Sequence, residues 1–369
     1  MAAPATIDAV LDDGGFRALI HELQLRGYVV IGPAVRDGAI NWQRIESADE
    51  LPCGWTVEQK PGSYRLKPRD DERYFGYANG PAGLKRFLHH PEARLYSVQR
   101  NGEPFHIVDE QRKAPRRAFV GVRACDLAAL KILDRVLLED RYPDALYQHQ
   151  REEAFIVAAS CTDPSPNCFC SSMNAGPEIE SGYDLLLTEL QDGRFVARAA
   201  TEAGGDVLSA VPHRQAAAED RAAATAAIAE GRGKITKRFD PAAARETLYN
   251  RFEHPAWDRA AARCFGCGSC TQVCPTCFCV TVEDTSDIDG SKAERWRKWD
   301  SCFTLSYSYI HGGSVRQSAK SRYRQWANHK FAAWYDQFGS AGCSGCGRCV
   351  TWCPAGIDVV EVLAEVVSG

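Results

Sequence analysis

Cysteines are the residues of this chain whose type and spacing could do chemistry, and eight of its sixteen cysteines form a pattern that occurs twice. The pattern, Cys-x2-Cys-x2-Cys-x3-Cys-Pro, begins at Cys264 and again at Cys343. With this spacing, three thiolates hold three irons of one [4Fe-4S] cube, while the fourth binds the cube of the other run. The predicted ligand sets are Cys264, Cys267, Cys270 and Cys353 for one cluster, and Cys343, Cys346, Cys349 and Cys274 for the other.

A zinc site and a disulfide framework are the alternatives for such a pattern. Structural zinc takes four ligands, usually as two separated Cys-x2-Cys pairs and not as a triple with a trailing Cys-Pro. Because each copy of the pattern supplies the ligand that the other copy lacks, the repeat favours two [4Fe-4S] clusters.

Four further thiols predict a third cluster in the first half of the chain. Two of them follow the apolar runs 118–122 and 154–159, and two come from a proline-rich turn shortly afterwards. If the runs are parallel strands, these thiols meet at the carboxyl edge of one sheet. The predicted set is Cys125, Cys161, Cys168 and Cys170. The alternative is packing, because free cysteine is often buried.

The last four cysteines have no ligand pattern. Cys277 and Cys279 follow the first ligand loop, and Cys302 lies in the segment Trp-Asp-Ser-Cys. They could form a further metal site, a redox-active thiol pair or a buried shell that tunes a cluster. Cys53 has no local partner, and we interpret it as a packing residue.

Short apolar runs predict the elements that position the first-half thiols. Gly-Pro at 32–33 should end the first strand, and Asp126 should cap the helix 126–134. Strands are predicted at 28–33, 118–122 and 154–159, and a hairpin at 183–188 and 194–197. Alternation of strands and helices indicates an α/β domain with a partly parallel sheet.

The second half is predicted to be ferredoxin-like. An alanine- and charge-rich stretch, 214–237, should form a helical connector that breaks at Gly231–Gly233. Helices are expected at 246–257 and after Asp358, and added helices between the two cysteine runs. The resulting prediction is an α+β fold with an α/β domain at 1–237 and a two-cluster, ferredoxin-like domain with a helical insert at 238–369.

Composition narrows the class of protein. With 369 residues, 45% hydrophobic content and no apolar run near the ~20 residues of a membrane span, we expect about two globular domains and no membrane partner. The N-terminus lacks the basic and apolar regions of a signal peptide, so we expect a cytoplasmic protein. A net charge of -4 gives no reason to expect nucleic acid.

No catalytic residue is predicted. The chain has neither a dinucleotide-binding nor a P-loop glycine motif, and no nucleophile–base arrangement stands out. The run 314–330 is rich in Arg and Lys and has no acid. It is predicted to be either a solvated helix face or a docking surface for an acidic partner.

These motifs resemble a known family. The chain is similar to beta subunits of sulfhydrogenases and NAD(P)-linked nickel–iron hydrogenases, and to the related iron–sulfur subunit of anaerobic sulfite reductases. The similarity extends through nearly the whole length and is carried most specifically by the strand-end cysteines and by two short segments. These segments are Cys-Pro-Thr-Cys-Phe-Cys at 274–279 and Trp-Asp-Ser-Cys at 299–302.

The resemblance implies an iron–sulfur electron-transfer subunit. Its partners would be a flavin- and NAD(P)-binding subunit of the diaphorase type, together with a catalytic subunit of a hydrogenase or a sulfur or sulfite reductase. A flavin is needed because an iron–sulfur cube passes single electrons whereas a hydride carries two. The alternative is a self-sufficient sulfur or polysulfide reductase that uses Cys277, Cys279 and Cys302.

Overall fold

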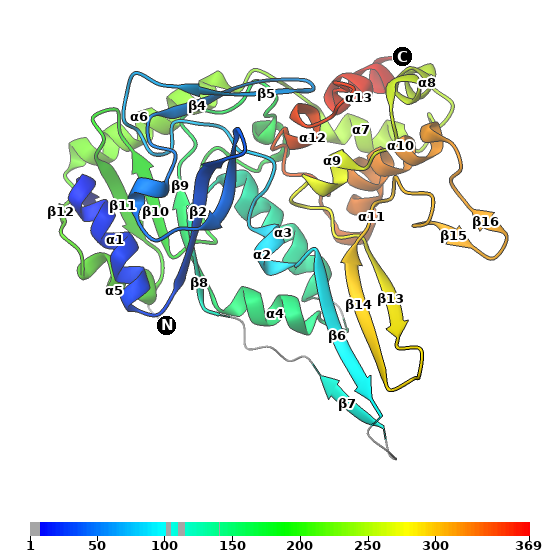
Figure 1. Cartoon of the computed structure of the whole chain (residues 1–369). Coiled ribbons are helices and arrows are strands. Elements are labelled where there is room, and N and C mark those ends of the chain that lie inside the picture. Colours follow the sequence, from blue (N-terminus) through cyan, green and yellow to red (C-terminus); the bar gives the residue numbers. More distant parts are fainter. Residues whose placement is uncertain (1–7, 101–104, 110–114, 140) are drawn as a thin grey trace.

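An eight-stranded sheet forms the centre of the first half of the chain (Figure 1). The computed structural model describes residues 8–100, 105–109, 115–139 and 141–369. Residues 1–7, part of the segment where we expect no signal peptide, lie outside the described residues. Across the sheet the strands are β12 (Arg214–Gln215), β1 (Asp8–Leu11), β11 (Phe195–Ala199), β10 (Leu185–Glu189), β9 (Ala154–Ala159), β8 (Arg117–Val122), β2 (Val29–Arg36) and β3 (Ala39–Arg44).

The sheet is partly parallel, as predicted. Its four middle strands, β2, β8, β9 and β10, run parallel to one another. The hairpin β10–β11 and the pairs β2–β3, β1–β11 and β1–β12 are antiparallel. With its surrounding helices the chain is therefore a mixed α+β protein.

Helices cover both faces of this sheet, which explains the continuous apolar runs in its middle strands. Side chains alternate between faces, so Val120 packs into the core beneath α1 and Phe119 into the core beneath α3. The covering helices are α1 (Asp13–Leu25) and α5 (Glu202–Ser209) on one face, α3 (Ala124–Leu137) and α4 (Ala145–Glu152) on the other, and α6 (Ala218–Lys234) beside β10 and β11.

Three local predictions in this half are wrong. Strand β2 continues through Gly32–Pro33 because beyond Ile31 it pairs with β3 alone, and proline is tolerated where a strand is at a sheet edge. Helix α3 begins before Asp126, which is buried inside it and does not cap it. Helix α6 does not break at Gly231, where a side chain would lie 2.4 Å from the carbonyl oxygen of Cys161.

The second half combines short helices with the two cysteine loops. Its last helix is capped by Asp358, as predicted, because that carboxylate accepts the N–H of Val360. The helices are α7 (Pro241–Leu248), α8 (Pro255–Arg263), α9 (Ser269–Gln272), α10 (Ala319–Asn328), the π-helical turn η3 (His329–Ala333), α11 (Trp334–Phe338), α12 (Arg348–Thr351) and α13 (Val359–Ser368).

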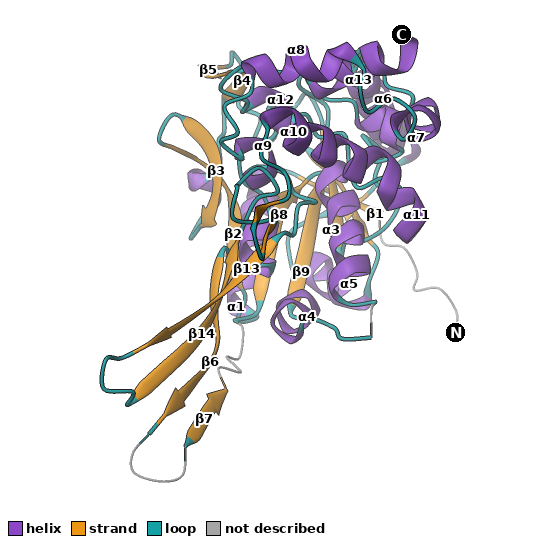
Figure 2. Cartoon of the chain, turned by 90° about the vertical axis from the view of Figure 1, so that its right-hand side faces the viewer, coloured by secondary structure: helices purple, strands orange, loops and turns teal. Residues whose placement is uncertain are grey.

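The insert between the cysteine loops is not only helical, which corrects that prediction. It begins with a β-hairpin, β13 (Val280–Ser286) and β14 (Lys292–Trp299), whose turn contains Asp289-Gly290, a common hairpin signal. Strand β14 of this hairpin pairs with β6 (Glu92–Gln99) of the first half, and β6 pairs in turn with β7 (His106–Asp109). The resulting four-stranded arm projects from the body (Figures 1 and 2).

Smaller elements complete the fold. The hairpin of β4 (Trp55–Lys60) and β5 (Ser63–Pro68) reaches across to the second half, where the N–H of Gly62 donates to the carbonyl of Val350. The others are the short helices η1 (Ala48–Glu50), α2 (Lys85–Leu88) and η2 (Cys170–Met173), and the hairpin of β15 (Tyr309–Ile310) and β16 (Gly313–Ser314). No helix within the described residues is both long and apolar enough to cross a membrane.

Candidate iron–sulfur sites

The thiols of the first predicted set lie around one cavity in the second half, which we call cavity I. They are Cys264, Cys267, Cys270 and Cys353. Most of the remaining wall is apolar and includes Phe303, Tyr323 and Trp326. Gly266 and Gly268 have φ angles of 66° and 73°, a backbone conformation that glycine adopts without strain. This loop geometry turns three successive thiols toward one space, and Cys267 is the exposed member of the set.

The second predicted set lines a neighbouring cavity, cavity II. Its thiols are Cys274, Cys343, Cys346 and Cys349. Gly345 and Gly347 repeat the backbone of the first loop, with φ angles of 66° and 74°. Cavities I and II share Trp326, Cys349 and Val359 in their walls, so the two spaces are adjacent.

The four strand-end thiols lie around a third space, cavity III. They are Cys125, Cys161, Cys168 and Cys170. The first turn of α3 supplies one thiol and the segment after β9 supplies the other three, so the carboxyl edge of the sheet positions the set. The Asn79 side-chain amide donates to the Cys125 sulfur at 3.2 Å. The buried Arg123 also lines this cavity.

The donor sets fit [4Fe-4S] cubes, which take four cysteine ligands each. Backbone N–H groups donate to thiol sulfurs at 3.3–3.4 Å, from Gly266 to Cys264, from Gly345 to Cys343 and from Ile357 to Cys353. No three His, Cys, Asp or Glu side chains in the described part of the chain are arranged to hold a single metal ion.

Burial controls the protonation of these thiols. It raises the pKa of Cys170 and of Cys343 to about 12, so both are protonated at neutral pH in the metal-free chain. Thiolates are the ligands of iron, and cluster binding would therefore release protons.

Cavities II and III are joined by direct backbone contact. The N–H of Phe169 donates to the carbonyl of Gly345 at 2.9 Å, and the Cys168 sulfur lies 3.7 Å from the carbonyl oxygen of Cys346. A Cβ on Gly345 would lie 2.7 Å from the Cα of Cys170. Only glycine leaves room for this approach, so these two thiol sets are close neighbours.

A buried ion pair spans the same junction. Arg348 donates to Asp126 at 2.8 Å, and both side chains are almost completely buried. The Arg348 guanidinium also donates to the carbonyl of Gly80. Sequence reasoning missed this pair, because its members lie 222 residues apart and belong to no motif.

The remaining thiols lie beside the predicted ligands or in the core. Cys277 is hydrogen-bonded to the sulfur of Cys274, which raises the pKa of Cys277. Burial raises the pKa of Cys302 to about 12, and the nearby Cys279 adds to this effect. Cys53 donates to the carbonyl of Glu72 and packs against the sheet core.

The basic run 314–330 is not a free charged face. Lys320 binds Glu253 and Asp258 of the same chain, and Arg324 also binds Glu253. Lys330 is buried, so it cannot contact a partner surface. Most of the positive charge that favoured a docking surface is therefore either paired with acidic residues of the same chain or buried.

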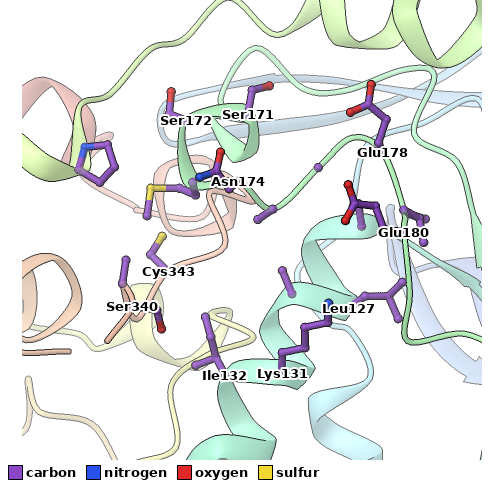
Figure 3. Close-up of a pocket in the computed structure, with 18 of the residues that line it drawn as sticks. Leu127, Lys131, Ile132, Ser171, Ser172, Asn174, Glu178, Glu180, Ser340 and Cys343 are labelled. Atoms are coloured by element: carbon purple, nitrogen blue, oxygen red, sulfur yellow. The ribbon is translucent and has the colours of Figure 1, made fainter. Parts of the chain in front are cut away.

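A large polar cleft borders cavities II and III (Figure 3). One wall is a face of α3 that includes Leu127 and Lys131, and another is the segment after Cys170. Cys343 reaches the cleft from the opposite side. The charged lining residues are Lys131, Arg135, Arg232, Arg238, Glu178 and Glu180.

Comparison with known proteins agrees with this chemistry. Residues 263–357 match the family described as a 4Fe-4S dicluster domain, which spans both cysteine loops. The chain is thus an iron–sulfur protein with a C-terminal 4Fe-4S dicluster domain.

One full-length relative makes the assignment more specific. The chain is 30% identical over 344 residues to sulfhydrogenase 2 subunit beta of Pyrococcus furiosus, and the match covers 92% of each protein. The chain belongs to the family of sulfhydrogenase beta subunits, which confirms the predicted resemblance. No solved structure matches it.

Proposed function

We propose that the chain is an electron relay within a multisubunit oxidoreductase. Its partners would be a flavin- and NAD(P)-binding subunit of the diaphorase type, together with the catalytic subunit of a hydrogenase or of a sulfur or sulfite reductase. The observation that supports this proposal best is a continuous series of three cavities, each lined by the four thiols of one predicted ligand set. Membership of the sulfhydrogenase beta-subunit family supports it independently.

Bound clusters would supply sites that accept and release single electrons. The thiols of cavities I, II and III would hold them, with Cys353 and Cys274 exchanged between the two ferredoxin loops. The glycine loops bring the thiols together, and the apolar walls limit water. Shared residues in the walls of cavities I and II, and the contact of Phe169 with Gly345, would keep successive clusters near one another.

The two predicted domains acquire roles under this proposal. Domain 1–237 would hold the cluster of cavity III, and domain 238–369 would hold the other two. The contacts of Arg348 with Asp126 and of Gly345 with Phe169 join the two parts where electrons would cross.

Two surfaces offer routes for electrons into and out of the chain. Cys267 is exposed beside cavity I, and Cys343 lines the polar cleft beside cavity II. We propose that one partner approaches each surface. We favour the relay over the self-sufficient reductase because the matched relative is named as one subunit, the beta subunit, of a sulfhydrogenase.

Iron analysis of anaerobically purified protein tests the cofactor content. Three cubes predict about twelve irons and about twelve acid-labile sulfides per chain. A value near eight, together with electron paramagnetic resonance signals of two clusters only, would remove the cluster of cavity III. Rapid sulfur reduction by the isolated chain with a chemical reductant would instead favour the self-sufficient enzyme.

A further inference from the structure

The walls of the three cavities differ in charge. Cavity I is lined by no charged side chain among the described residues, cavity II by one lysine, Lys330, and cavity III by one arginine, Arg123. The two ferredoxin loops repeat each other in sequence and backbone, so this difference between cavities I and II comes from outside the repeated motif.

Lys330 lies on the π-helical turn η3 and is only 5% exposed. Its ammonium nitrogen lies 3.4 Å from the Cys274 sulfur, and it donates to Thr276 Oγ1 at 2.9 Å and to the Gly342 carbonyl at 3.0 Å. Thr276 Oγ1 itself lies 3.1 Å from the same sulfur. The two neutral acceptors thus hold the Lys330 ammonium group beside the sulfur of Cys274, which is a predicted cluster ligand.

A second buried lysine lies on the other side of Cys274. Lys85, which is 6% exposed, donates to the carbonyls of Cys274 at 2.9 Å and Cys277 at 3.1 Å. Its ammonium group also lies 3.8 Å from the centre of the Trp299 ring. Two buried ammonium groups therefore surround one ligand residue.

Within the described residues, neither lysine has a carboxylate within ion-pair distance. A buried cation without a counter-charge is costly. A [4Fe-4S] cube held by four thiolates is anionic, and it would supply the missing charge beside both lysines.

We propose that Lys330, assisted by Lys85, is the counter-cation of the cluster in cavity II and raises its reduction potential. This inference rests on the proposed iron–sulfur relay. Reduction adds one negative charge to the cluster, and a nearby positive charge in a low-dielectric surrounding stabilises the reduced form more than the oxidised form. Lys330 is a positioning residue that acts through Cys274, and no lysine or arginine in the described part of the chain lines cavity I.

Redox titration followed by electron paramagnetic resonance tests this inference on the complete, anaerobically purified chain. The signal of cavity II is the one lost in Cys346→Ser. Lys330→Met and Lys330→Gln should both move the midpoint potential of the cavity II cluster to more negative values, because both remove the positive charge. Lys330→Gln keeps a hydrogen-bond donor, so it separates the loss of the charge from the loss of the donor. Lys330→Arg should remain closer to the unaltered protein, and the signal of cavity I should move less in every variant.

Lys292→Met is the matched control, because Lys292 lies at the start of β14 in the arm and lines none of the three cavities. An unchanged cavity II potential in Lys330→Met at full iron content, or an equal shift in Lys292→Met, would overturn the inference. If Lys330→Met fails to assemble the cluster, the midpoint potential of the cavity II cluster is measured in Lys85→Met instead. A more negative potential supports the inference, and an unchanged potential overturns it. Missing clusters in the unaltered protein would instead contradict the proposed function.

Discussion

Glu189 is a carboxyl group buried at the end of β10, next to the core of the sheet. Its two oxygens accept the backbone N–H groups of Tyr74 at 2.6 Å and Phe75 at 2.8 Å. Burial raises its pKa to about 7, although both hydrogen bonds favour the ionised form and oppose the rise. Desolvation therefore outweighs hydrogen bonding at this residue.

The raised pKa predicts a pH effect with a definite sign. Between the unfolded value of 4.5 and the folded value of about 7, the folded chain binds the proton and the unfolded chain does not. The contribution of Glu189 to stability therefore falls as pH rises through this window. Infrared difference spectra against Glu189→Gln should show a protonated carboxyl band below pH 7 that disappears above it. A carboxylate band throughout would show that the hydrogen bonds dominate.

At the scale of elements, the fourth cysteine of each run lies with the thiols of the other loop. Cys353 follows the second loop along the chain but lines cavity I with the thiols of the first loop. We therefore predict that Cys353→Ser damages the cluster held by the distant loop 264–270. Electron paramagnetic resonance of the variant, compared with Cys346→Ser, would identify which signal is lost. Loss of the cavity II signal alone would mean that the chain has abandoned the exchange.

Local sequence patterns predicted the groups of thiols because motif spacing and strand ends are local properties. Cys125, Cys161 and the Cys168–Cys170 pair could be grouped from the expected parallel strands before any contact was known. Lys330 and the Arg348–Asp126 pair could not be predicted, since their partners are distant in sequence and no periodicity marks them. The hairpin 280–299 had a usable signal in its Asp-Gly turn, and the expectation of helices overlooked it.

At the scale of the whole molecule, the two halves interlock through Gly345. A side chain there would meet the backbone of Phe169–Cys170 at 2.7 Å, and its φ of 66° disfavours any other residue. We predict that Gly345→Ala lowers iron from about twelve to about four per chain, because cavities II and III lose their shared contact.

Gly339→Ala is the control for backbone strain. Gly339 has a similar φ of 71°, but nothing lies within 4 Å of the added carbon. It should cost roughly 1 kcal/mol of stability and retain its iron. An equal loss of iron in both variants would show that strain, and not the contact between the halves, determines cluster loading, and full iron content in Gly345→Ala would contradict the prediction.

The projecting arm has a consequence for how the chain is made. Arg94 on β6 bonds Glu294 on β14 across 200 residues of sequence, and β14 lies between β6 and β13 in the arm. A ribosome that adds about 5–20 residues per second needs on the order of 10–40 seconds to produce β14 after β6. During that interval the edge of β6 opposite β7 has no strand to pair with, and unpaired edges attract other chains. The nascent first half therefore presents an aggregation-prone edge until the insert emerges, and a chaperone would be needed most in this period of synthesis.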